Sequence, residues 1–413
     1  MNNLRQLIHK TNIRVLRKYS QQCTTEVPKP VTFLTDDEIM MRDTAARLAT
    51  EKIGPYVRQM ENEGKVHDSV LSMLFENGLM GIEIDPKYNG TGSKFMTSML
   101  VVEELSKVDA AVAAMVDIHN TLVCNLVSKQ ANEAQKEKYL PLLASKSVAS
   151  ICISEPSAGS DAFAMKTTAR KEGSDYVING SKMWISNSDI ADVFLVMANA
   201  KPEIGYKGIT CFIVERNTPG LTVGKPENKL GIVASGTCQV HFDNVRVPET
   251  NILGKFGDGY KYTADILNEG RIGIAAQMLG IAEGCFNATI PYTLERKQFG
   301  EPIFKFQGMQ YQIARTATEI ECARMMVYNA ARLQEQGLEQ EVRKHGAMAK
   351  LFACEVAQRT TINCIDWMGG VGFTKDFPQE KFYRDCKIGS IYEGTSNMQL
   401  STIAKFIEKE FKQ

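Results

Sequence analysis

The sequence predicts an α+β multidomain protein, with an N-terminal all-α domain and a C-terminal α-helical bundle on either side of a middle β-barrel-like or β-sandwich domain. The chain has 413 residues, which is long for a single compact domain. Apolar residues recur at helical spacing over residues 35–150 and again over 259–413, whereas residues 151–255 form β-branched runs separated by turn residues. These two changes of period predict three domains with those boundaries.

The composition is that of a globular protein and excludes several classes of function. Hydrophobic residues make up 44% of the chain, and 48 basic side chains balance 48 acidic ones. Zero net charge gives no support for nucleic-acid binding, which needs a basic face. No apolar run reaches the length of a membrane-spanning helix. The ten cysteines and five histidines are scattered without metal-ligand or Cys–His spacing, so we expect reduced thiols and no metal site.

The first 30 residues differ from the rest of the chain in charge. Arg5, Lys10, Arg14 and Arg17 alternate with apolar residues, and no acidic residue precedes Glu26. This pattern is typical of a mitochondrial transit peptide. The alternative is a disordered basic tail. The sequence therefore predicts a transit peptide over residues 1–30 and a protein of the mitochondrial matrix.

Local signals position the elements of the three domains. Thr35 and Glu38 form a capping box that starts the first helix, and Pro86 interrupts the helical pattern of this domain. In the middle domain, Asn179-Gly180 predicts a hairpin turn between residues 175–178 and 181–186. Further strands are expected over 193–197, 209–214 and 240–247. After Gly259 the helical period is expected to continue to the end.

One carboxylate near the end of the chain stands out. Glu393 lies between Tyr392 and Gly394 in the stretch KIGSIYEGTSNMQL. In an apolar setting its pKa would rise, and a carboxylate of raised pKa can serve as a general base. The alternative is an exposed glutamate beside a turn glycine. Taken alone, this stretch favours the alternative.

Six motifs in order change that interpretation. They are ISEPSAGSD, NGSKMWIS, LNEGR, ERKQFG, WMGGVGF and IYEGTSN. Singly each is a turn, a core tryptophan, a surface arginine or a helix-ending glycine pair. Together they closely resemble the acyl-CoA dehydrogenase family over nearly the whole chain after residue 35. Within the family, the chain is most similar to members that act on short and branched acyl chains such as 2-methylbutyryl-CoA. The resemblance implies the acyl-CoA dehydrogenase fold.

The resemblance also implies an FAD site, although no G-x-G-x-x-G follows a strand and the site is therefore not a dinucleotide-binding βαβ unit. The residues implied beside the flavin ring are Ile151, Cys152, Ile153, Ser154, Ser160, Trp184, Ile185 and Ser186. Those implied to reach the FAD of a neighbouring subunit are Arg296, Gln307, Asp366, Trp367, Met368, Gly369 and Gly370, while Thr395, Ser396 and Asn397 would close over the chain's own FAD. A shared cofactor implies an oligomer, and similar family members are homotetramers, a dimer of dimers.

For the substrate, the family pattern implies contacts along the acyl-CoA from Ser160, Tyr206, Tyr260, Asn268, Glu269, Gly270 and Arg271. In a subset of the family the base occupies the position before the matching arginine. That position is Gly270 here, which has no side chain to act as a base. Glu393 is therefore the expected catalytic residue among the matched positions.

The resemblance implies α,β-dehydrogenation of a short acyl-CoA thioester to the trans-2-enoyl-CoA. Glu393 would remove the α-proton, flavin N5 would accept the β-hydride, and electron-transfer flavoprotein would reoxidise the FAD. The alternatives are a short straight-chain acyl-CoA dehydrogenase, an acyl-CoA oxidase, and a non-enzymatic scaffold or assembly flavoprotein of the same fold. The chain ends in Glu-Phe-Lys-Gln rather than the peroxisomal signal expected of many oxidases. Retention of Glu393 argues against the scaffold.

Overall fold

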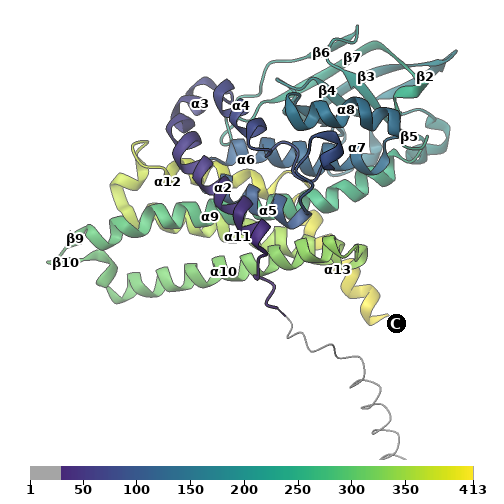
Figure 1. The fold of residues 1–413 in the computed structure, drawn as a ribbon. Helices are drawn as coiled ribbons and strands as arrows, with labels where there is room; N and C mark the ends of the chain where they lie inside the picture. Colours follow the sequence, from purple (N-terminus) through teal and green to yellow (C-terminus); the bar gives the residue numbers. More distant parts are fainter. Residues whose placement is uncertain (1–28, 413) are drawn as a thin grey trace, which may run out of the picture. The chain divides into compact units, whose positions relative to one another are not determined.

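The computed structural model describes residues 29–412. The predicted transit peptide therefore lies, apart from its last two residues, outside the described residues. Leu34–Gln413 form one compact unit, in which a sheet region lies between two helical regions along the chain (Figure 1). The predicted fold class is confirmed.

The N-terminal region is helical. The Thr35 hydroxyl accepts a hydrogen bond from the backbone N–H of Glu38, and the Glu38 carboxylate accepts one from the backbone N–H of Thr35, so the predicted capping box is confirmed. The interruption at Pro86 is also confirmed, as a short 3-10 turn. The helices are α2 (Asp36–Arg47), α3 (Val57–Glu63), α4 (Asp68–Glu76), α5 (Phe95–Ser106), α6 (Ala110–Asp117), α7 (Asn125–Gln130) and α8 (Glu133–Ser145), with π-helical η1 (Leu48–Ile53) and η4 (Ile118–Cys124).

Eight strands form one mixed sheet in the order β6-β7-β3-β2-β4-β5-β8, with β1 pairing in parallel with β4. The strands are β1 (Ala149–Cys152), β2 (Thr168–Glu172), β3 (Asp175–Ser186), β4 (Val193–Asn199), β5 (Ile209–Glu215), β6 (Leu221–Val223), β7 (Thr237–Pro248) and β8 (Ile252–Leu253). The three strands expected over 193–197, 209–214 and 240–247 are confirmed as β4, β5 and the main part of β7.

Strand β4 shows why this region is so apolar. Successive side chains of a strand point to opposite faces. Leu195 and Met197 lie in a cluster with residues of η4 and α8. Phe194 and Val196 lie in a second cluster with residues of β3 and β7. The strand is therefore buried on both faces, which explains its continuous apolar run.

The hairpin predicted at Asn179-Gly180 is wrong. Both residues lie inside the continuous strand β3, at a register shift against β7. The turn between β2 and β3 is instead at Gly173-Ser174, where Gly173 has φ +63°. The register shift makes the Asn-Gly pair a β-bulge. Glycine is needed there, because a Cβ at position 180 would lie 2.4 Å from Oγ1 of Thr167.

The C-terminal region is helical, with one small exception. Its helices are α9 (Gly259–Glu295), α10 (Gln307–Glu335), α11 (Glu339–Met368), α12 (Gln379–Cys386) and α13 (Ser396–Phe411). Figure 1 shows α9, α10 and α11 as long helices below the sheet region. Between α9 and α10 a two-stranded hairpin, β9 (Lys297–Gln298) and β10 (Glu301–Pro302), interrupts the predicted helical pattern. Phe299 and Gly300 form its turn at positive φ, as a two-residue hairpin requires.

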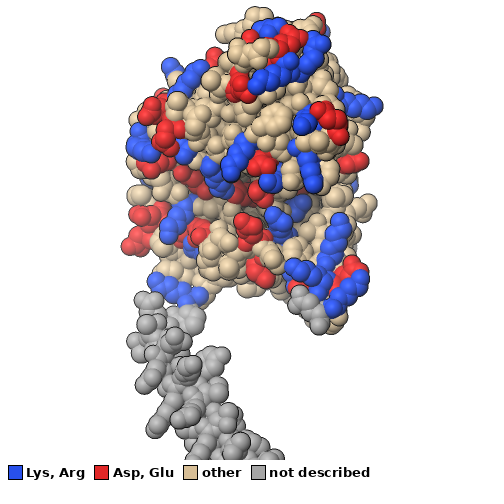
Figure 2. Space-filling model, turned by 90° about the vertical axis from the view of Figure 1, so that its right-hand side faces the viewer, with Lys and Arg blue, Asp and Glu red and all other residues tan. Residues whose placement is uncertain are grey.

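Two further properties concern the apolar segment 110–130 and the charged surface. Residues 110–130 are long and apolar enough to cross a membrane by composition, but the apolar window is wholly buried within the fold. On the face shown in Figure 2, basic and acidic side chains are intermixed.

Candidate active site

The Glu393 side chain lies where the segment before α13 packs closely against helix α9. Glu393 lies in the short segment between the 3-10 turn η10 (Lys387–Ser390) and α13. Its carboxylate lies over Gly270 of α9, because a Cβ built at position 270 would be 2.7 Å from Oε2 of Glu393 and 2.9 Å from Cδ2 of Leu122. The absence of a side chain at position 270 therefore makes the space that this carboxylate occupies.

One oxygen of this carboxylate, Oε2, is buried and makes no hydrogen bond within the described part of the chain. Burial raises the pKa of Glu393, while the positive charges of Lys350 and Arg271 lower it. The buried oxygen makes no hydrogen bond within the described part of the chain, so its lone pair is free to accept a proton. A carboxylate of raised pKa with such an oxygen can serve as a general base.

A second buried carboxyl group, Asp117, lies close enough to Glu393 for the two to interact electrostatically. Asp117, at the end of α6, accepts a hydrogen bond from Thr121 at 3.0 Å, and burial raises its pKa to about 8, with smaller contributions from Glu393 and Glu83. At neutral pH, Asp117 is therefore held mostly in its neutral form beside the base.

The residue before the base is also fixed by hydrogen bonds. The Tyr392 hydroxyl donates to Oε1 of Gln277, whose amide donates in turn to the carbonyl of Ala110 at 2.8 Å.

The two sheet segments predicted to line a cofactor lie side by side. Ser150 of β1 donates to the carbonyl of Ser186 at 2.5 Å, and the backbone N–H of Met183 donates to the carbonyl of Ser154 at 2.9 Å. These bonds bring Ile151–Ser154 against Trp184–Ser186. The side chain of Trp184 is 55% exposed and its φ is +62°. An apolar face held uncovered by an unusual backbone conformation fits a flat aromatic ligand.

A buried ion pair braces the loop after β1. Nζ of Lys182 lies 2.9 Å from Oε1 of Glu155 and donates to the carbonyl of Ile153 at 3.0 Å. Glu155 also accepts from the backbone N–H groups of Lys166 and Thr167 at 2.6 and 3.0 Å. The glutamate of the ISEPSAGSD motif therefore uses its carboxylate to hold the loop in shape.

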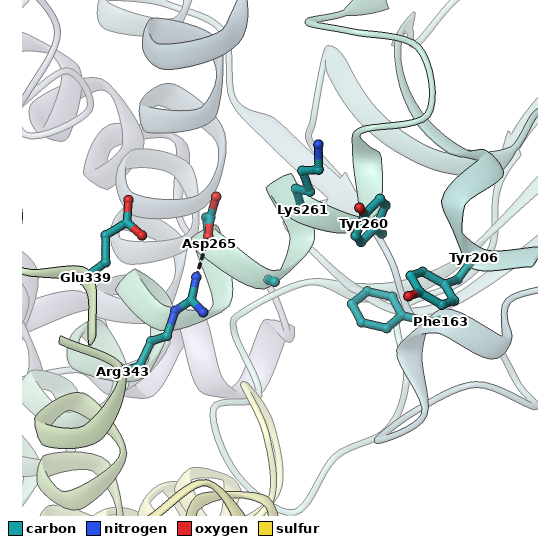
Figure 3. Close-up of a pocket in the computed structure, with 8 residues that line it drawn as sticks. Phe163, Tyr206, Tyr260, Lys261, Asp265, Glu339 and Arg343 are labelled. Atoms are coloured by element: carbon teal, nitrogen blue, oxygen red, sulfur yellow. Dashed lines mark hydrogen bonds and ion pairs between the residues drawn. The ribbon is translucent and has the colours of Figure 1, made fainter. Parts of the chain in front are cut away.

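A cavity of about 560 Å³ lies beside the first turns of α9. In Figure 3, Phe163, Tyr206 and Tyr260 lie on one side and Glu339 and Arg343 on the other. The rings of Tyr206 and Tyr260 meet edge to face with centroids 5.1 Å apart. This cavity contains two of the predicted substrate residues, and the exposed Ser160 is not among the residues that line it.

Helix α9 connects this cavity with the base. Tyr260 and Asp265 line the cavity, while Asn268 accepts a hydrogen bond from Arg271 at 3.0 Å one turn further on. The span from Tyr260 to Gly270 covers about 15 Å of helix at 1.5 Å per residue. Glu269 points elsewhere, since it pairs with Lys129 of α7 and accepts from Gln334 of α10 at 2.6 Å.

The remaining predicted cofactor residues lie in other parts of the C-terminal region. Arg296 caps the end of α9 and is exposed, and Gln307 begins α10 and donates to Tyr311 at 2.6 Å. Asp366, Gly369 and Gly370 are exposed, whereas Trp367 and Met368 are buried. Thr395 caps α13, next to Ser396 and the exposed Asn397. Of these, only the segment 395–397 is adjacent to Glu393.

Several site residues were missed by the sequence reasoning. Lys350 and Asp117 face the base, while Phe163 and Arg343 line the cavity. A usable signal existed for one of them. Lys350 falls on the apolar stripe of α11 with Gly346 and Ala353, and a lysine on a buried stripe is a rare residue with a role to explain. The other three carry no signal in one sequence, because their roles depend on contacts between distant segments.

We expect Gly270→Ala to lower kcat/KM by about 10²-fold, because the added methyl group would displace the carboxylate of Glu393 by a fraction of an ångström or more. The helix itself should be no less stable, since alanine favours a helix interior by about 0.5–1 kcal/mol over glycine. Gly346→Ala on α11 is the matched control, because its nearest contact is the side chain of Ile272 at 3.3 Å. Turnover and melting temperature would be measured together. Unchanged turnover in Gly270→Ala would contradict the close approach.

Comparison with known proteins gives concordant matches. Family models described as acyl-CoA dehydrogenase N-terminal, middle and C-terminal domain match residues 35–147, 150–245 and 257–408. The chain is 58% identical over 382 residues to the short/branched chain specific acyl-CoA dehydrogenase, mitochondrial, of Bos taurus, covering 92% of this chain and 88% of that protein. Two solved chains both superpose with a TM-score of 0.88, covering 91% of this chain and 99% of the solved one. One is butyryl-CoA dehydrogenase from Megasphaera elsdenii, at 36% identity, and the other comes from a study of the electron transferring flavoprotein of Acidaminococcus fermentans, at 38%.

Proposed function

Because the chain belongs to the acyl-CoA dehydrogenase family, we propose that it is an FAD-dependent dehydrogenase of short and short branched-chain acyl-CoA thioesters, with Glu393 as its catalytic base. The observation that carries the proposal is the buried, unpartnered oxygen of Glu393 over Gly270. The Bos taurus relative is named for short and branched chains, which supports that range of substrates.

In the proposed reaction the substrate loses two hydrogens and gains a Cα=Cβ double bond. Glu393 takes the α-proton on its free oxygen, and the electrons of that C–H bond form the new π bond as the β-hydrogen leaves. Bound FAD supplies the acceptor for that hydrogen, taken up as a hydride. Leu122 and the backbone of Gly270 exclude water from around the carboxylate, which keeps its pKa raised and its proton affinity high. The Tyr206–Tyr260 pair lies at the start of α9, where the CoA portion would enter.

The FAD-binding residues proposed are the loop from Ile151 to Ser160, together with Trp184 and Ser186. The exposed indole of Trp184 and the bracing of the loop by Lys182 and Glu155 fit a planar ring system. For the second part of the cofactor, exposed Arg296, Gln307 and the 366–370 segment would reach the FAD of a neighbouring subunit. Phe299 and Phe373, near these segments in sequence, are 97% and 82% exposed, which supports burial in a homotetramer. Sedimentation of the purified protein tests that assembly.

Location and electron acceptor complete the proposal. The Bos taurus relative is named as mitochondrial, and the acid-free basic segment before Glu26 supports import into the mitochondrial matrix with removal of residues within 1–30. The similarity to a chain from a study of an electron transferring flavoprotein supports such a flavoprotein as the electron acceptor.

The substrate range is tested with 2-methylbutyryl-, isobutyryl-, butyryl-, isovaleryl- and octanoyl-CoA. We expect the highest kcat/KM with 2-methylbutyryl-CoA and at least about 10-fold lower values with octanoyl-CoA, since each misplaced methylene costs about 10–200-fold. Turnover is measured with a dye acceptor in the presence and absence of oxygen. Comparable values for octanoyl-CoA would reject the short-chain assignment, and oxygen-driven turnover without the dye would favour an oxidase.

A further inference from the structure

Lys350 is a buried lysine whose contacts are unusual. It lies on α11 and is 1% exposed. Its ammonium donates to the carbonyl of Tyr392 at 2.6 Å and to the carbonyl of Gly394. These carbonyls belong to the residue before Glu393 and the residue after it. A buried ammonium normally faces a carboxylate, whereas this one uses its donors to grip the backbone around a single residue.

That residue has a backbone conformation that needs support. Glu393 has φ +49°, in the left-handed region that residues with a side chain rarely adopt, and Gly394 follows at φ +86°. Gln399 of α13 adds a second tie, since its amide donates to the carbonyl of Gly394 at 2.8 Å and to that of Glu393 at 3.3 Å. All three carbonyls of this turn are therefore held, and a strained conformation persists where its surroundings fix it in this way.

The direction of the Glu393 side chain depends on this turn. With its φ in the left-handed region, Glu393 places its carboxylate over Gly270. A return to an ordinary right-handed or extended conformation would rotate the Cα–Cβ bond and move the carboxylate off α9. The ties to the turn therefore control where the free oxygen lies.

Lys350 also acts on the charge of the base. The charged and titratable groups that interact electrostatically with the Glu393 carboxylate include Lys350 from α11, Arg271 from α9 and Asp117 from α6. Lys350 and Arg271 favour the ionised form of Glu393, whereas a charged Asp117 would oppose it. Burial lowers the pKa of Lys350, and the negative charge of Glu393 opposes that shift. Lys350 thus differs from Gln399, which supports the same turn without a charge.

We propose that Lys350 is a positioning residue for the catalytic base: its ammonium clamps the carbonyls of Tyr392 and Gly394, keeps Glu393 in the left-handed conformation, and stabilises the ionised carboxylate. The inference rests on the proposed role of Glu393 as the base. It assigns two separable effects to Lys350, one on geometry and one on charge. Gln399 shares only the first.

The test compares Lys350→Met with Gln399→Met in flavin-loaded enzyme. Lys350→Met should lower kcat by about 10²-fold with little change in KM. The acid limb of its kcat profile should move to higher pH by about 1 unit, because loss of a nearby cation raises the pKa of a carboxylate. Gln399→Met should lower kcat while leaving the acid limb in place. Infrared titration measures the same shift without turnover. The carboxyl band of Glu393 is isolated by subtracting the spectrum of Glu393→Gln from that of the wild type, and the same subtraction is made in the Lys350→Met and Gln399→Met variants.

Several outcomes decide the matter. An acid limb and infrared titration that are unchanged in Lys350→Met would overturn the proposal, as would an equal shift in Gln399→Met. If Lys350→Met does not fold, Lys350→Gln, which keeps a neutral donor, should still show the shifted titration, and a wild-type titration there would overturn the proposal. If Glu393→Gln itself stays active, the base assignment fails rather than this inference. In that case the infrared titration alone tests the coupling of Lys350 to Glu393.

Discussion

Glu393→Gln is expected to lower the rate of flavin reduction by about 10²- to 10⁴-fold, the usual contribution of a positioned general base. The amide keeps the shape of the side chain and removes the basic lone pair, and Gly270 opposite has no side chain to replace it. FAD content should be unchanged. The measurement is anaerobic bleaching of the flavin after mixing with 2-methylbutyryl-CoA.

The pH dependence of the wild type provides a second reading. Burial raises the pKa of Glu393 above the ordinary value of 4.5. The base must be ionised to accept the α-proton, so the rate should fall as the pH drops through this raised pKa. Glu408→Gln on α13 is the matched control, because the Glu408 side chain is 60% exposed and forms an ion pair with the exposed Lys412. Flavin reduction at close to the wild-type rate in Glu393→Gln would remove this residue from the reaction.

Lys381→Met is expected to destabilise the fold by about 3–5 kcal/mol, the usual effect of breaking a buried ion pair. Nζ of Lys381 lies 3.1 Å from Asp109 and 2.6 Å from Asp385, and the three side chains are at most 7% exposed. Asp109 caps α6, and Asp385 accepts from the backbone N–H of Ile232 at 2.6 Å. One ammonium therefore joins helices α6 and α12 to the loop before β7. Melting temperature and urea midpoint would measure the loss.

The loss of stability in Lys381→Met should become smaller as the pH falls. Burial raises the pKa of Asp385, and Lys381 lowers it. Without the ammonium, folded Asp385 would bind a proton more tightly than in the unfolded chain, so the folded variant gains stability as the pH falls. The difference from wild type should thus shrink as the pH falls through the raised pKa of Asp385 in the folded variant. Lys412→Met removes an exposed lysine and should cost at most about 1 kcal/mol. A small, pH-independent loss in Lys381→Met would show that the two carboxylates are solvated without it.

Local signals in the chain were read correctly where neighbouring residues decide the structure. The capping box at Thr35 depends on side chains within one turn, and the strands are predicted by β-branched runs between turn residues, so both can be counted along the chain. The Asn179-Gly180 pair shows the limit of such signals. The same dipeptide serves a hairpin turn or a bulge, and the choice depended on Thr167, which lies across the sheet at a contact distance that only glycine permits.

The candidate site divides in the same way. By itself, the sequence determined the fold class and the motif that contains Glu393, because periodicity and motif order are properties of one chain read in line. Only the tertiary structure decided that Oε2 of Glu393 is buried over Gly270, that Lys350 binds the turn around Glu393, and that Asp117 is near enough to affect its charge. Burial, orientation and pKa arise when α6, α9, α11 and the segment before α13 are brought together. Desolvation and Coulomb interactions depend on distances through space, and the spacing of residues along the chain does not contain them.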